Sequence, residues 1–348
     1  MRKSILKFVF CLMSISMFSQ GVETFVLAAG DAGRLAENYV NPFVKGFMYD
    51  LNGGWYTTAK THKKKFGFDL TINPSISFVP ASDEFFTFVP GDYSYLSLPN
   101  GENSLPTVMS DSDQEALVEV RIPYGEDTYK VAEFDMPGGI GADLPIKAVP
   151  VPMAQVGFGF FGNTDFKVRF VPSISPAENF KFDLFGLGVQ HSILPYFKVD
   201  NPILNVSVLA AFTNMKMTYT IENDTDFDEV DVQNGAAEFK VNTWTLQAIA
   251  SVDLKLITFY GAVGYNSGKS SVKMKGDYTL TYDVEDGQGN MIGSVSETIS
   301  DPISMNFQAN GMRGTLGTRL NLGFFKIFAD YTFQEYNTLT GGIAFSFN

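Results

Sequence analysis

The chain has 348 residues, 45% of them hydrophobic, and its 38 Asp and Glu against 25 Lys and Arg give a formal net charge of −13. That hydrophobic fraction is too high for a disordered chain, and the acidic balance lacks the basic footprint of a nucleic-acid-binding protein. The abundance of Phe (33), Tyr (15) and Gly (32) favours strands with aromatic faces. The length by itself allows two soluble domains or one large β-domain.

The first twenty residues have the layout of a secretory signal peptide. Basic residues near the amino terminus precede an apolar stretch at 8–18, which is shorter than the roughly 20 apolar residues of a membrane-spanning helix. We predict that residues 1–20 are removed, and small residues up to Ala29 also permit a later cleavage. The only cysteine, Cys11, lies in this segment behind bulky residues that do not suit a lipid anchor. The exported chain is therefore expected to contain no thiol.

The next segment predicts a helix. Apolar residues between Asp31 and Asp50 recur mainly every four positions, which forms one apolar stripe, and Pro42 is expected to bend or restart the helix. Because such a stripe has few places to dock in front of a barrel, we predict that residues 21–50 plug the barrel lumen from the periplasmic side. A helix on the periplasmic surface is the alternative. The residues expected to line the plug and any ligand are Tyr39, Pro42, Phe43 and Phe47.

The remainder of the chain, residues 51–348, alternates between apolar and polar positions. The pattern is clearest over residues 243–255 and recurs at 66–72, 325–333 and 339–347. Strands of soluble proteins average about 5 to 6 residues, whereas two-faced segments of about 10 residues in an exported chain are typical of membrane barrels. We therefore predict an all-β fold, a transmembrane antiparallel β-barrel of 12 to 14 strands with a short amino-terminal helical plug. About nine of the strands follow Met153, and about three lie between residues 51 and 98.

An insertion near residues 99–152 accounts for the uncertainty in the strand count. It contains a possible hairpin at 116–122 and 129–134, whose mixed charges place it outside the membrane or in the lumen. If the last strand ends in the periplasm, the long polar connections fall on the extracellular side. The strands that flank Asp286 are much longer than the roughly 9 to 11 residues that cross a membrane, so this hairpin should project beyond the bilayer.

Residues able to support chemistry are sparse. His62 and His191 have no second His or Cys at ligand spacing, and no Gly-x-Ser-x-Gly motif is present. We predict no catalytic, cofactor or metal site, and no enzymatic activity. The basic run Lys60–Lys65 is expected at a strand turn on the outer-leaflet side, where it could pair with lipopolysaccharide phosphates. A solvated turn is the alternative.

Several runs resemble an uncharacterised outer-membrane β-barrel family of the Bacteroidota. They are residues 41–60 with 66–70, residues 144–157 and residues 184–191, so the resemblance covers nearly the whole exported chain. More distantly, an amino-terminal hatch that enters a barrel resembles the FadL-like transporters of hydrophobic compounds, although none of their ligand residues maps onto this sequence. The resemblance implies the outer membrane of a Gram-negative bacterium, with its lipid and lipopolysaccharide, and insertion by the barrel assembly machinery.

These features predict a function without naming a substrate. A barrel of this size is narrower than the 16 to 18 strands of open porins. We therefore expect passive uptake of small hydrophobic or amphipathic compounds, gated by the plug. The alternative is a structural or partner-binding barrel that displays long extracellular hairpins, for adhesion or as a component of a secretion machine.

Overall fold

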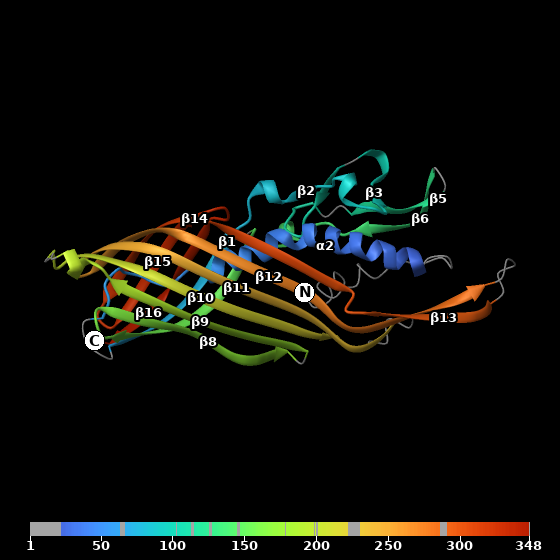
Figure 1. Cartoon of the computed structure of the whole chain (residues 1–348). Coiled ribbons are helices and arrows are strands. Elements are labelled where there is room, and N and C mark those ends of the chain that lie inside the picture. Colours follow the sequence, from blue (N-terminus) through green and yellow to red (C-terminus); the bar gives the residue numbers. More distant parts are fainter. Residues whose placement is uncertain are drawn as a thin grey trace.

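The fold is taken from a computed structural model of the chain (Figure 1). The predicted signal peptide, residues 1–20, lies outside the described part. The structure describes residues 22–62, 67–101, 103–112, 115–124, 127–144, 147–177, 179–197, 199, 201–221, 230–285 and 291–347.

One large antiparallel sheet closes on itself. Strand β1 pairs with both β16 and β7, and β11 pairs with both β10 and β12, so every strand of the ring has two neighbours. β13 (Met291–Ser300) pairs with the end of β12 and lies outside the ring. The ring strands are β1 (Phe68–Phe78), β7 (Ala148–Phe160), β8 (Thr164–Ala177), β9 (Phe180–Ser192), β10 (Leu204–Ile221), β11 (Val230–Asp253), β12 (Ile257–Glu285), β14 (Ile303–Leu322), β15 (Phe325–Phe333) and β16 (Thr338–Phe347).

The predicted barrel class is confirmed, but the predicted strand number is wrong. Ten strands of the described residues form the ring, rather than 12 to 14. The nine strands predicted after Met153 are all in the wall. The error lies in residues 51–98, which contribute only β1 to the wall instead of about three strands. Residues 52–62 are held inside the barrel, and residues 79–98 belong to a separate layer. The hairpin that would have raised the number to fourteen also lies outside the ring.

Outside the ring, one layer and one long helix cover an end of the barrel. We call residues 79–147 the cap. Its hairpin β5–β6 pairs with β3, as predicted for a hairpin outside the wall, and β2 pairs with β4. Its elements are β2 (Phe85–Thr87), β3 (Leu96–Ser97), β4 (Ser104–Pro106), β5 (Ala116–Tyr124), β6 (Asp127–Met136), and the short 3₁₀ helices η1 (Ala81–Asp83), η2 (Pro90–Asp92), η3 (Pro99–Gly101) and η4 (Gly141–Asp143). A further 3₁₀ helix, η5 (Leu194–Phe197), follows β9.

Helix α2 (Val22–Leu51) confirms the predicted amphipathic helix and begins earlier than expected. It runs through Pro42 without interruption. It packs against β14, β7 and β1 at the barrel end covered by the cap (Figure 1). None of the described helices is long and apolar enough to cross a membrane.

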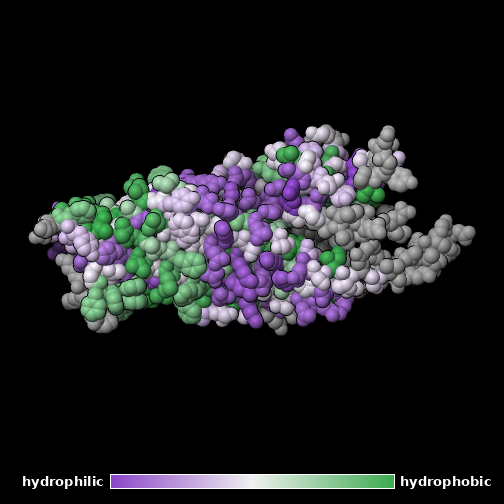
Figure 2. Space-filling view, in the orientation of Figure 1, coloured by the Kyte–Doolittle hydropathy of each residue, from purple (hydrophilic) through white to green (hydrophobic). Residues whose placement is uncertain are grey.

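Side chains of the ring alternate between the lumen and the outside, as predicted. On β11, Thr245 and Gln247 are buried while Trp244, Leu246 and Ala248 are exposed. The outward residues of this strand are apolar from Trp244 to Leu254 and polar at Asn242, so the apolar belt is about as wide as the 9 to 11 residues that span a bilayer. On the visible face, Figure 2 shows hydrophobic residues gathered over the part of the barrel that contains the carboxyl terminus, and a hydrophilic surface next to them.

The connections differ between the two ends of the barrel. At the end that holds the carboxyl terminus, the turns at 161–163, 254–256 and 323–324 are short, and residues 193–203 form a longer connection. The other end carries the cap and the β12–β13 hairpin, which projects well beyond the apolar belt as predicted (Figure 1). We call these the carboxyl-terminal end and the cap end. If the last strand ends in the periplasm, as assumed from the sequence, the carboxyl-terminal end faces that side.

An arginine in the apolar belt is expected to be costly. Ala248 faces outward near the middle of the belt, so Ala248→Arg should lower the free energy of unfolding in lipid by about 2 to 4 kcal/mol. Asn242→Arg, on the same face of β11 beyond the belt, is the matched control and should cost about 1 kcal/mol or less. Urea titrations in vesicles measure both. Equal costs at the two positions would contradict the placement of the belt.

The main apolar core lies between α2, the cap and the inner wall at the cap end. This core includes Leu35, Val44 and Met48 from α2, Phe88, Leu105, Met109 and Val118 from the cap, and Met153, Leu184, Met215, Val241 and Phe307 from the wall. A second, smaller apolar cluster lies in the lumen at the belt, among many polar side chains, and consists of Trp55, Tyr56, Ala59, Leu209, Ala211, Ile249, Tyr260 and Ala262.

Candidate functional site

Residues 52–62, which we call the lumen segment, connect α2 to β1 through the interior of the barrel. Side chains from strands all around the ring contact this segment: Arg169 on β8, Gln190 on β9, Gln247 on β11 and Arg313 on β14. Because α2 lies at the cap end and β1 begins at the carboxyl-terminal end, the segment crosses the length of the lumen (Figure 1). The barrel is therefore threaded by its own chain.

Two buried arginines of the wall hold the end of helix α2. Arg169 donates to the carbonyl oxygens of Leu51, at 2.9 Å, and Gly53, at 2.5 Å. Arg313 donates to the carbonyl oxygen of Asn52 at 2.8 Å. The last carbonyls of a helix have no partner within it and carry partial negative charge, and α2 has no basic residue in its last turn. The barrel wall supplies the missing cations.

Trp55 is the largest buried side chain of the lumen segment. The Arg169 guanidinium lies over its ring, 3.7 Å from the centroid. The indole also lies close to glycines of β9, and a Cβ added at Gly188 would lie 2.9 Å from the Trp55 ring. Gly188 is thus required by a close approach to the lumen segment. The indole therefore contacts both a cation and bare backbone.

Below Trp55 the segment is held by polar side chains. The Tyr56 hydroxyl donates to Gln247 Oε1 at 2.8 Å, and the Tyr56 ring meets Tyr260 edge-on. The backbone N–H of Ala59 donates to Ser251 Oγ at 3.0 Å, and the Thr58 Oγ1 lies 3.1 Å from the same oxygen.

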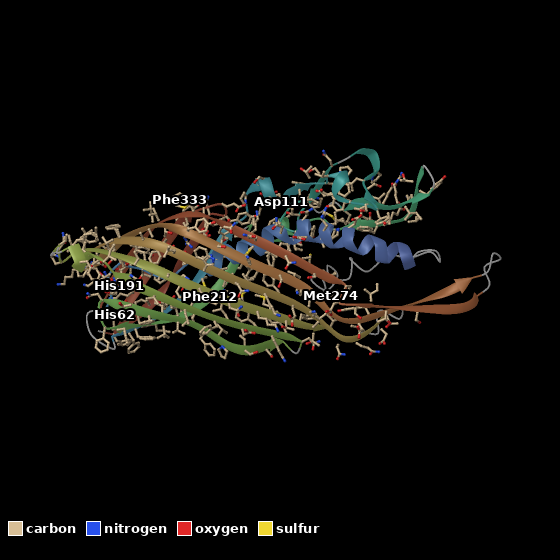
Figure 3. The ribbon with its side chains drawn as sticks, in the orientation of Figure 1. His62, Asp111, His191, Phe212, Met274 and Phe333 are labelled. Carbon is tan, nitrogen blue, oxygen red and sulfur yellow. The ribbon has the colours of Figure 1, made fainter. Side chains whose placement is uncertain are left out.

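At the carboxyl-terminal end, His62 completes the anchoring. Its backbone N–H donates to Asp165 Oδ1 at 3.0 Å, and its Nδ1 lies 3.0 Å from Asp165 Oδ2. Figure 3 shows His62 and His191 at this end of the barrel. Every level of the lumen segment is therefore attached to the wall.

The polar lining is only partly satisfied. Several buried polar atoms of the described lumen have no hydrogen-bond partner, including Trp55 Nε1, both side-chain polar atoms of Asn73, and Thr243 Oγ1. Buried polar groups in native proteins are usually paired with protein groups or with ordered water, and the polar surroundings of these atoms suit water molecules.

A second set of contacts fixes α2 at the cap end. Lys45 Nζ lies 2.8 Å from Glu335 Oε1 in the turn between β15 and β16, and the Tyr49 hydroxyl donates to the same carboxylate. Tyr336 stacks on Tyr49 and donates to Asp83 of the cap at 2.5 Å. Burial, together with the hydrogen bond to Glu335, raises the pKa of Tyr49 well above its usual range, so this phenol stays a donor.

The four residues predicted to line the plug all lie on α2, in different surroundings. Tyr39 is buried and donates to the Gly138 carbonyl at 2.8 Å, and Pro42 is buried. Phe47 meets Phe239 of β11 edge-on, whereas Phe43 is 38% exposed. Helix α2 lies at the cap end, where the apolar core is available to it. If the last strand ends in the periplasm, this is the end opposite to the predicted periplasmic insertion.

The basic run Lys60–Lys65 was predicted at a strand turn on the outer-leaflet side. Its described residues Lys60 and His62 lie at the carboxyl-terminal end, where they line the mouth of the barrel. Residues 63–66 lie outside the described part. The cause is the threading, which brings the chain to the start of β1 from inside the lumen.

Sequence reasoning missed the residues that hold the lumen segment. Trp55 and Tyr56 fell within residues 51–98, which were predicted to hold about three strands, and no role was assigned to Arg169 or Arg313. One signal was present: both arginines occupy inward positions of their strands, β8 and β14. A charge at membrane depth needs a partner inside the protein.

The family comparison identifies the chain. Residues 1–347 match the model described as "Family of unknown function (DUF6588)", so the chain belongs to this family. No curated protein matches it.

Solved structures of other barrels are similar to this chain only distantly. They include Ail, the attachment invasion locus protein of Yersinia pestis, at 10% identity and a TM-score of 0.27, covering 82% of this chain and 100% of Ail. The outer membrane protease OmpT from Escherichia coli has 10% identity and a TM-score of 0.29, covering 83% and 100%. The Pseudomonas putida toluene transporter TodX has 7% identity and a TM-score of 0.25, covering 96% and 95%. At these values they support no argument about what this chain does.

Proposed function

We propose that this member of the DUF6588 family is an outer-membrane barrel that is closed by its own lumen segment and passes small solutes when that segment shifts. The polar attachment of residues 52–62 in the belt region carries this proposal. The export signal, the apolar belt and the short turns at the carboxyl-terminal end support the location.

The nature of the contacts makes a shift feasible. A net intramolecular hydrogen bond contributes only about 0.5 to 1.5 kcal/mol, because water replaces it when it breaks. The larger apolar core, which would be costly to open, lies at the cap end, whereas the belt region combines polar pairs with a smaller apolar cluster around Trp55 and Tyr56. The lumen segment should therefore be displaced more easily than α2.

The movement we propose is local. Both ends of the lumen segment are fixed, one by α2 in the apolar core and the other by β1 in the wall. Ejection toward the carboxyl-terminal end would require α2 to pass through the ring of ten strands. A sideways displacement of Trp55 and Tyr56 opens the lumen without disturbing either anchor.

The lining favours amphipathic solutes over purely apolar ones. The belt region presents hydroxyl, amide and guanidinium groups, and the aromatic rings of Trp55, Tyr56 and Tyr260 provide apolar contact. Ligand sites generally combine apolar surface with a few polar groups that fix orientation. Of the hydrophobic or amphipathic compounds expected from the sequence, we therefore favour the amphipathic ones.

A reversible lock tests the proposal directly. Thr58 Oγ1 and Ser251 Oγ are 3.1 Å apart, so the pair Thr58→Cys and Ser251→Cys should form a disulfide in a Cys11→Ser background. We expect the oxidised protein to block uptake of a small amphipathic dye into proteoliposomes, and a reductant to restore it to the level of the unmodified chain. Each single cysteine variant serves as a control and should be insensitive to the reductant.

The same uptake measurement decides between gated solute passage and a display or partner role. Equal uptake in the oxidised and reduced states, at verified disulfide formation, contradicts gating by the lumen segment. Absence of uptake by every variant, in assembled barrels, favours the display or partner role of the cap and the β12–β13 hairpin instead.

A further inference from the structure

A pocket of about 530 Å³ opens at the carboxyl-terminal mouth of the barrel. It lies between the end of the lumen segment and the short turns that follow β11 and β14, and its volume is in the range of small-molecule sites. Four cationic side chains and one carboxylate line it: Lys60, Lys255, Arg319, Lys326 and Asp253. This balance is the reverse of the chain as a whole, whose formal net charge is −13.

The single carboxylate is already committed to neighbours inside the mouth. Asp253 accepts hydrogen bonds from Thr58 at 2.8 Å, Ser251 at 2.6 Å, Asn205 at 2.9 Å and Thr258 at 3.0 Å. Its Oδ1 also lies 3.5 Å from Arg319 Nη2. Asp253 therefore neutralises the arginine and leaves the lysines uncompensated.

The ammonium groups of the three lysines have hydrogen-bond donors that the described residues do not use. Within the described part of the chain, none of Lys60, Lys255 and Lys326 forms an ion pair. Lys326 donates one bond to the Gly323 carbonyl at 2.6 Å, and an ammonium group has three donors. Asn321 and Ser346 add neutral polar groups to the same lining. The pocket therefore concentrates positive charge and hydrogen-bonding groups.

We infer that this pocket binds a small phosphate-bearing anion. A ligand with a single carboxylate would neutralise only one of the three unpaired lysines. A phosphate dianion carries two negative charges and several acceptor oxygens, so it matches the pocket better. The position at the mouth lets such an anion be held before it enters the lumen. The inference goes beyond the gating proposal, because binding at the mouth requires no open lumen.

Two lysines provide the test variant. Lys60 and Lys255 are exposed and make no side-chain bond to a described residue, so Lys60→Ala with Lys255→Ala should leave the fold intact. The matched control removes two exposed lysines outside the pocket, Lys181→Ala with Lys269→Ala. The formal charge changes equally in both proteins.

Calorimetric titration of the detergent-solubilised full chain with inorganic phosphate measures the affinity. We expect saturable binding by the unmodified chain and the control, and about fivefold to tenfold weaker binding by the pocket variant. Raising the salt concentration should reduce this difference. Absence of saturable binding to the unmodified chain, or equal affinities of the two variants, would overturn the inference.

Nanodiscs separate the two sources of such a group, a soluble phosphate ester and the headgroup of an anionic phospholipid. In phosphatidylcholine discs the phosphate affinity should match that in detergent. If it falls in phosphatidylglycerol discs for the unmodified chain but not for the pocket variant, the headgroup occupies the pocket. If it is the same in both discs, the source is soluble. Phosphate binding is measured without any change in the lumen segment other than Lys60 and does not depend on solute uptake, so failure here and failure of gating are distinguishable.

Discussion

Deletion of residues 22–60 is expected to convert the closed barrel into a conducting pore. This removes α2 and most of the lumen segment while leaving His62 and every wall strand in place. The polar inner face then fills with water, because its hydroxyl and amide groups lose the peptide that occupied them. Planar bilayers should show discrete conductance steps, smaller than those of open porins with 16 to 18 strands.

A shorter deletion is the control for this result. Removing residues 31–48 takes away most of α2 but keeps the lumen segment and its contacts with Gln247 and Ser251. If the lumen segment is the barrier, this protein should stay nearly silent in the bilayer. Both deletions must retain heat-modifiable migration on gels, which shows that the barrel is assembled. An assembled but silent 22–60 deletion would contradict the proposed barrier, and strong conductance after the shorter deletion would move the barrier to α2.

Arg169→Ala is expected to release the lumen segment without removing it. The variant loses two charge-assisted hydrogen bonds to the carbonyls of Leu51 and Gly53, each worth about 1.5 to 3 kcal/mol, and the cation that covers Trp55. Docking of the segment should therefore weaken by about 3 kcal/mol or more. The chain contains only two tryptophans, and in a Trp244→Phe background Trp55 alone reports the change.

Acrylamide quenching measures the exposure of that indole. Trp55 is 1% exposed in the closed barrel, so quenching should be weak before the substitution and rise several-fold after it. Arg121→Ala is the matched control, because it removes an arginine from a partly buried ion pair with Glu119 in the cap, remote from the lumen. Unchanged shielding of Trp55 in assembled Arg169→Ala protein would show that the arginine does not hold the segment.

The sequence was sufficient to predict features that depend on one strand or helix alone. Side chains of a strand alternate strictly, so the apolar and polar faces of residues 243–255 could be assigned without knowing any partner. The same holds for the strands after residue 153 and for the extension of β12 beyond the belt, which follow from segment length and turn residues. The amphipathic stripe of α2 was likewise readable from its spacing.

Tertiary structure decided what depends on which surfaces meet. An extended stretch such as residues 52–62 looks the same along the chain whether it lies in the wall or in the lumen, and this ambiguity produced the wrong strand number. The end of the barrel that receives α2 depends on where a matching apolar surface exists, and that surface is assembled from the cap and the wall. Arg169 and Trp55 are far apart in sequence, and only closure of the ring brings the guanidinium over the indole to hold the segment in place.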